Sequence, residues 1–179
     1  MNISYQSPNF TGKYIKPVNI LKNNKPTTAS LIELTKKDIN CIDDLAEMWD
    51  TKITEMISTS MYQPLKGTVG QNIYVISTQN KNFEKVSPKK VLGIFEVTDR
   101  SDVFALEYLE VKPTQAFGNK RRTFTEIGKA CIDYIKSRFK QKDVEIFSLR
   151  EAAPFYEKMG CIKHPKCDSA FWYMIPKHD

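Results

Sequence analysis

The stretch ALEYLEVKP (Ala105 to Pro113) decides the fold of this chain. Its pattern is typical of a strand, and a basic loop follows it. Next come a helical run, IGKACIDYI (Ile127 to Ile135), and a second apolar strand, VEIFSL (Val144 to Leu149). The segment APFYEKMGC (Ala153 to Cys161) then predicts a short helix. A run of strand, helix, strand and helix after a meander narrows the choice of fold.

The first part of the chain predicts an arm, a strand and a helix. Residues 1–28 are polar and show no helical period, so we expect an extended arm, with Tyr14 to Leu21 as a candidate edge strand. Residues 29–34 predict the first strand of the domain. Apolar residues then recur every three or four positions, which predicts one amphipathic helix ending near Ser58 to Ser60. Its apolar face comprises Ile42, Leu45, Trp49, Ile53 and Met56.

The middle of the chain predicts a meander, because three strands follow one another without intervening helices. These strands cover Ile73 to Ser77, Val91 to Asp99 and Val103 to Val111. The helix after them runs to about Phe139, and the short helix ends at Gly160 as a left-handed cap. Phe171 to Ile175 predicts the last strand.

Composition sets broad bounds on the class of protein. The 179 residues suit one domain, and no stretch approaches the roughly 20 apolar residues of a membrane span. The cysteine spacing forms no disulfide framework, so we expect reduced thiols and a cytoplasmic location. The formal net charge of +6 favours solubility and anionic ligands. Because the lysines are spread along the chain, a dedicated nucleic-acid tail is not indicated.

These segments resemble the GCN5-related N-acetyltransferase superfamily over roughly residues 29 to 176, most strongly in LEYLEVKP and PFYEKMG. The resemblance implies a single domain over residues 29–179, after an arm of residues 1–28. The expected fold class is α/β (α+β in the stricter sense), with a mixed, mostly antiparallel sheet and helices on both faces. It also implies acetyl-coenzyme A as co-substrate, no metal, and a small-molecule or peptide amine as acceptor. The oligomeric state stays open, a homodimer included.

The resemblance further implies where the coenzyme binds. Two strands splay apart to admit the pantetheine arm, which pairs with backbone groups near Leu109 and Val111. The pyrophosphate is expected at the start of the following helix. There the family pattern is Arg or Gln, two residues, Gly, one residue, then Gly or Ala. This chain has Thr123 where the pattern has Arg or Gln, and Glu126 where it has the first Gly. The implied binding residues are Lys120, Arg121, Arg122, Thr125, Ile127, Gly128, Lys129 and Tyr156.

Catalytic groups are expected on the strand and on the last helix. Tyr156 matches the family tyrosine that protonates the departing thiolate. Glu110 and Glu107 are candidates for the general base, and alternation places them on opposite strand faces. Glu110 is preferred because it shares a face with Tyr108, and Glu151 is a third candidate.

Two other functions stay open on the sequence. The altered glycine pattern favours a catalytically silent binding protein of the same fold, and the basic loop suggests a nucleic-acid-binding module that lacks any recognised motif. The run from Cys161 through His164 to Cys167 is a poor metal site, since no fourth ligand has suitable spacing. Neither His164 nor His178 has an evident partner in the sequence.

Overall fold

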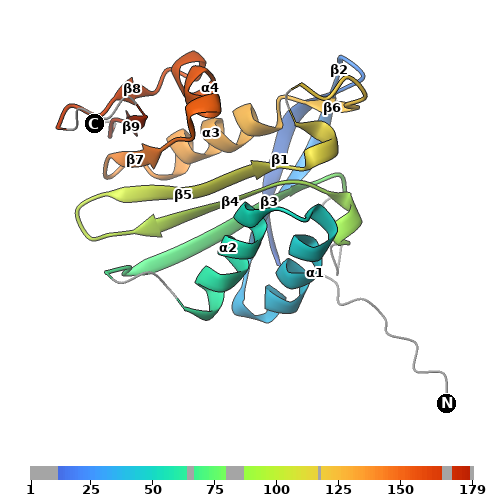
Figure 1. Ribbon diagram of the computed structural model, residues 1–179, viewed down its shortest axis with the longest axis horizontal. Coiled ribbons are helices and arrows are strands. Elements are labelled where there is room, and N and C mark those ends of the chain that lie inside the picture. Colours follow the sequence, from blue (N-terminus) through green and yellow to red (C-terminus); the bar gives the residue numbers. More distant parts are fainter. Residues whose placement is uncertain (1–11, 64–66, 80–86, 117, 167–170, 178–179) are drawn as a thin grey trace.

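The computed structural model describes residues 12–63, 67–79, 87–116, 118–166 and 171–177. Among these residues the strands form one nine-stranded sheet in the order β6-β1-β2-β3-β4-β5-β7-β9-β8 (Figure 1). The strands are β1 (Lys13–Lys22), β2 (Lys25–Leu34), β3 (Gly70–Ser77), β4 (Val91–Asp99), β5 (Phe104–Val111), β6 (Phe124–Thr125), β7 (Val144–Phe147), β8 (Ile162–Lys163) and β9 (Trp172–Ile175). The α-helices are α1 (Ile39–Trp49), α2 (Lys52–Tyr62), α3 (Ile127–Arg138) and α4 (Ala153–Lys158). Single 3₁₀ turns cover Lys36–Asp38, Pro88–Lys90, Pro113–Gln115 and Arg150–Ala152.

The sheet is mixed but mostly antiparallel, as expected. Strands β5 and β7 pair in parallel, and the other neighbouring pairs are antiparallel. Helices α1 and α2 cover one face, where Ile42, Leu45 and Ile57 pack into one apolar core. Helices α3 and α4 cover the other face around a second core, which includes Ile132 and Tyr156. The predicted fold class is therefore confirmed.

The candidate strand Tyr14–Leu21 is present within β1 (Lys13–Lys22), but residues 13–28 are part of the sheet rather than an arm. Strands β1 and β2 form an antiparallel hairpin within the sheet. Asn23 and Asn24 make its tight turn, both with positive φ (50° and 62°), a conformation that asparagine tolerates better than most residues. Polar composition concealed this hairpin, because only one side of β1 is apolar and buried. Residues 1–11 lie outside the described part of the chain.

The single helix expected up to Ser58–Ser60 is in fact two helices. Asp50 ends α1 in the left-handed conformation (φ 52°), and Thr51 then caps α2 by accepting a hydrogen bond from the Thr54 N–H. The periodicity of the apolar residues runs through this break, which explains why the sequence suggested one helix. The bounds of other elements differ from the expected ones by one to four residues. For example, β7 ends at Phe147 rather than Leu149.

Candidate active site

The parallel pairing of β5 and β7 is short. It covers three residue pairs, from Phe104–Val144 to Leu106–Ile146, whereas β5 pairs with β4 along its whole length. Beyond Leu106 the described residues of β5 have a strand neighbour on one side only. We call this point, between β5 residues 107–111 and the end of β7, the β5–β7 fork. An extended ligand that carries amide groups can add to such a strand edge.

Two predicted binding residues lie on this edge of β5. The side chains of Leu109 and Val111 are half-buried and pack against the core beneath α3. Their side chains therefore stabilise the fold, and only their backbone groups are placed to serve a ligand at the fork.

The first turn of α3 lies tightly against the sheet and against α4. A methyl group at Gly93 on β4 would come within 2.8 Å of the Ile127 side chain, which is buried. A methyl group at Gly128 would come within 3.1 Å of the Phe155 ring of α4. The side chain of Glu126 makes no capping hydrogen bond at this helix start, where the first N–H groups of a helix favour an anion.

Glu126, immediately before α3, has an unusual backbone conformation. Its φ is +66°, in the left-handed region where glycine is strain-free and glutamate is not. This is the position at which the family pattern has glycine. Its exposed carboxylate also places negative charge at the helix start. The backbone conformation here is one that suits glycine, while the carboxylate works against anion binding.

The basic loop before α3 is held at its two ends. The side chain of Gln115 accepts hydrogen bonds from the N–H groups of Thr123 (2.8 Å) and Phe124 (2.6 Å). Thr125 then pairs with Leu21 of β1. Between these ends the side chains of Lys120, Arg121 and Arg122 are exposed.

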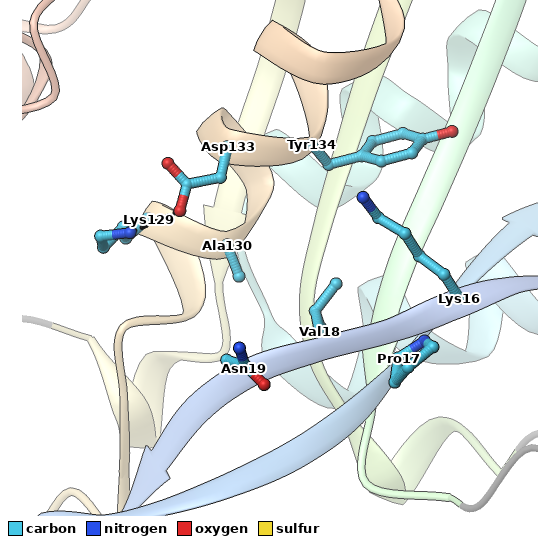
Figure 2. A pocket seen from close by; sticks show the side chains of 8 residues that line it. All are labelled: Lys16, Pro17, Val18, Asn19, Lys129, Ala130, Asp133 and Tyr134. Carbon is cyan, nitrogen blue, oxygen red and sulfur yellow. Dashed lines mark hydrogen bonds and ion pairs between the residues drawn. The ribbon is translucent and has the colours of Figure 1, made fainter.

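Lys129 lies on a different side of α3 from Gly128. Its ammonium group is 2.5 Å from the Asp133 carboxylate, which raises the pKa of Lys129. Both side chains line a pocket of about 250 Å³ between α3 and β1, in which Lys16 and Tyr134 face each other (Figure 2). The structure therefore places Lys129 beside β1, whereas Gly128 contacts α4.

Tyr156 is 7% exposed and belongs to the core beneath α4. Its ring packs 5.2 Å from that of Phe155 and 6.0 Å from that of Tyr173, centroid to centroid. Burial, and then the nearby thiols of Cys161 and Cys131, raise the pKa of Tyr156. The phenol therefore keeps its proton at neutral pH, as a proton donor must.

A β-bulge corrects the expectation for the two glutamates. Tyr108 pairs with Glu96 and Leu106 pairs with Val97, so Glu107 is an extra residue in β5. Glu107 accepts a hydrogen bond from Thr98, on the face covered by α2. Glu110 lies on that face too, contrary to the prediction of opposite faces, because the bulge shifts the alternation by one residue.

The carboxylate of Glu107 already accepts hydrogen bonds from Arg100 and Thr98. Arg100 makes a two-pronged contact with it, at 2.7 and 2.9 Å from one guanidinium nitrogen and 3.1 Å from another. With the Thr98 hydroxyl added, little of the carboxylate is free to accept a further proton. Its side chain is 12% exposed.

Glu110 has neutral surroundings. The Thr51 hydroxyl, between α1 and α2, donates a hydrogen bond of 2.8 Å to it. Burial raises the pKa of Glu110, although the hydrogen bonds from Thr51 and from the Thr54 backbone partly oppose this. A half-buried carboxylate with a raised pKa suits general-base catalysis near neutral pH, so Glu110 stays the preferred candidate for the base. Glu151, the third candidate, is exposed in a 3₁₀ turn.

Sequence reasoning missed Glu96, a fully buried carboxylate on β4. Ser60 (2.7 Å) and Gln71 (2.9 Å) donate hydrogen bonds to it. Burial raises the pKa of Glu96, and these two hydrogen bonds lower it in part. Glu96 and Glu107 together raise the pKa of Tyr108, after burial. The available signal was a lone charged residue within the apolar run GIFEV.

His164 has a partner, contrary to expectation. Its ring nitrogen lies 3.2 Å from a carboxylate oxygen of Glu145, and its ring lies 5.3 Å from that of Trp172. No group of metal-binding side chains occurs among the described residues, which exclude Cys167 and His178. In the same part of the chain, no helix has the length and apolarity to cross a membrane.

Of the comparisons with known proteins, the one with solved structures gave matches. No family model matches the sequence, and no curated protein matches it. A tandem GNAT protein from the clavulanic acid biosynthesis pathway is 17% identical and superposes with a TM-score of 0.50. The match covers 76% of this chain and 45% of that one. Tetrahymena GCN5 is 12% identical (TM-score 0.49, 80% of this chain and 91% of that one). The AtaT toxin is also 12% identical (TM-score 0.49, 98% and 95%).

The chain therefore has the fold of the GCN5-related N-acetyltransferases. At this level of identity the likeness concerns the fold alone.

Proposed function

We propose that this protein transfers an acetyl group from acetyl-coenzyme A to a primary amine. The observation that carries the proposal is the β5–β7 fork beside the uncapped start of α3. An open strand edge suits the amide-bearing pantetheine arm, and a helix start suits the pyrophosphate. The GNAT fold supports the same assignment.

The proposed reaction is a direct attack within a ternary complex. The amine nitrogen forms a bond to the thioester carbon, and the carbon–sulfur bond breaks. Glu110 accepts the proton that the amine loses, and Tyr156 donates a proton to the departing thiolate. Backbone N–H groups near Val111 would stabilise the oxyanion. A phenol with a raised pKa gives up its proton reluctantly, so its placement beside the sulfur has to supply most of the benefit.

Calorimetric titration of the purified protein with acetyl-coenzyme A tests the first step. We expect micromolar binding that the triple variant Lys120→Ala/Arg121→Ala/Arg122→Ala loses, because exposed cations beside the helix start would contact the phosphates. A control triple variant removes the same charge from exposed lysines elsewhere: Lys13, Lys140 and Lys177. Absence of binding up to millimolar concentration would rule the proposal out.

A screen of primary amines for thiol release then tests turnover. Glu126 supports a second candidate, a silent GNAT-fold protein, since a carboxylate at the helix start opposes the pyrophosphate. Binding without thiol release for any amine would favour that candidate. If thiol is released, Tyr156→Phe should reduce kcat while the Kd for acetyl-coenzyme A stays unchanged.

A further inference from the structure

A group of aromatic rings, of which Phe147 is exposed and Trp172 and His164 are partly buried, lies on the β7–β9–β8 end of the sheet. Phe147 is 69% exposed, although a phenylalanine within a strand is usually covered. Its ring meets that of Trp172 edge-on at 6.1 Å, and the His164 ring lies 5.3 Å from Trp172 on a tilted plane. We call these three rings the aromatic platform. Ile162, 47% exposed, and Met174 extend it with apolar surface.

The platform faces away from α3 and α4. Along β7, Val144 and Ile146 point into the core beneath α3, so Glu145 and Phe147 point to the opposite face. Trp172 pairs directly with Phe147 and shares that face. Helices α1 and α2 pack on this face over other strands of the sheet, and the core there includes residues of β2, β3 and β4.

The platform adjoins the proposed site. The last pair between β5 and β7 is Leu106–Ile146, so Glu107 and Phe147 are the next residues on the two arms of the fork. Glu107, Tyr108 and Glu110 lie on the same face of the sheet as Phe147. On the strand next to the platform, Glu107 is the carboxylate closest in register to Phe147, and Glu110 lies three residues further along β5.

Charge on this face suits a cation. Arg100 balances Glu107, and His164 contacts Glu145. Among the residues that the structure describes, the hydrogen-bond donors to Glu110 are neutral groups, at Thr51 and Thr54. An ammonium group would therefore form an ion pair with Glu110, and an aromatic ring would pack on the platform.

We propose that the acceptor is a primary amine that carries an aromatic ring, with the ring on the platform and the amine at Glu110. This inference rests on the proposed acetyl transfer. It adds a substrate class that the fold does not specify, because the rings of Phe147 and Trp172 are features of this sequence.

Kinetics with matched amines test the inference. We expect a lower KM for phenethylamine than for butylamine, and Phe147→Ala should raise the KM for phenethylamine about three- to tenfold. The same variant should leave the KM for butylamine unchanged. Val69→Ala, which trims another exposed apolar side chain (71% exposed), is the control. Equal KM values for the two amines in the wild type would overturn the inference.

A binding measurement separates this inference from the proposed function. Phenethylamine should shift the indole N–H signal of Trp172 in NMR spectra recorded without acetyl-coenzyme A, and Phe147→Ala should weaken that shift. If acetyl-coenzyme A does not bind, acetyl transfer fails while this titration still reports on the platform. If sedimentation shows a dimer that Phe147→Ala dissociates, a second copy covers the platform and the inference is wrong.

Discussion

Glu110 combines partial burial, a raised pKa and a neutral hydrogen-bond partner. A general base must be ionised, so kcat/KM should fall as pH drops through the pKa of Glu110. Because that pKa is raised, this acid limb should lie above the ordinary glutamate value of about 4.3. Glu110→Gln should abolish the limb and lower kcat/KM about 10²- to 10⁴-fold. The pH–rate profile measures both effects.

Glu107→Gln is the matched comparison for that prediction. Because Arg100 and Thr98 already occupy the Glu107 carboxylate, the loss of activity should be smaller. A larger loss from Glu107→Gln than from Glu110→Gln would reverse the assignment of the base.

Glu96 predicts a pH dependence of stability. Burial raises its pKa in the folded state, so the folded protein binds its proton more tightly than the unfolded chain does. The contribution of Glu96 to the free energy of unfolding is therefore fully present below the pKa that Glu96 has in the unfolded chain. It is lost as pH rises through the pKa that Glu96 has in the folded protein. Glu96→Gln should have a higher Tm than the wild type at pH 7, and the difference should shrink toward pH 4. Calorimetric melting curves check this, and a lower Tm at pH 7 would show that the charge itself is required.

The sequence named candidate catalytic residues, but it did not predict correctly on which face of the sheet their side chains lie. It named both glutamates of β5, but simple alternation assigned them to opposite faces because a bulge leaves no mark in a single sequence. It missed Glu96, since its burial depends on Ser60 and Gln71, which come from α2 and β3. Tyr156 was named from its motif, and its catalytic role stays a prediction.

The start of α3 is the element on which the proposed coenzyme binding depends. Glu126 holds the left-handed conformation there, at a cost of about 1–2 kcal/mol relative to a residue without strain. Glu126→Gly should relieve the strain and remove a repulsive charge, so both the Tm and the affinity for acetyl-coenzyme A should increase. Calorimetric titration and thermal melting measure the two effects. Glu126→Gln is the control, because it removes the charge but keeps the strain, and should improve affinity alone. An unchanged affinity in both variants would place the pyrophosphate elsewhere.

Among the elements, those with a regular pattern of apolar residues were predicted correctly, whereas the breaks and turns between elements were missed. Strands β3, β4 and β5 were predicted from runs of β-branched and aromatic residues. The break at Asp50 was missed, because the apolar stripe continues from α1 into α2. The sequence predicted strands at Tyr14–Leu21 and at residues 29–34, but not that the Asn23–Asn24 turn joins them into a hairpin.

For the molecule as a whole, the sheet should differ in stability along its width. Strand β3 has eight registered pairs with β4, whereas β7 has three with β5 and four with β9. Local opening should therefore be easier at β7 than at β3. In native-state hydrogen exchange, the amides of Val144 and Ile146 should exchange faster than those of Val75 and Ile76. Acetyl-coenzyme A should slow exchange in β7, and equal rates in the two strands would contradict this expectation.

The order of strands and helices from β2 onwards was largely predictable, because each element occupies its own stretch of sequence. The fork was expected only through family resemblance. No local pattern states that β5 and β7 part after Leu106 and Ile146, since that depends on how α3 and α4 pack over the sheet.

The parallel placement of β7 beside β5 also bears on how the protein is made. Strands β1 to β5 each pair with a neighbour in sequence, so they can assemble as the chain leaves the ribosome. Strand β7 reaches β5 only after α3 has been synthesised, and β9 comes later still. A nascent chain would hold Glu110 on a formed sheet before the second arm of the fork exists. Competence to bind the acetyl donor would thus be the last property acquired during translation.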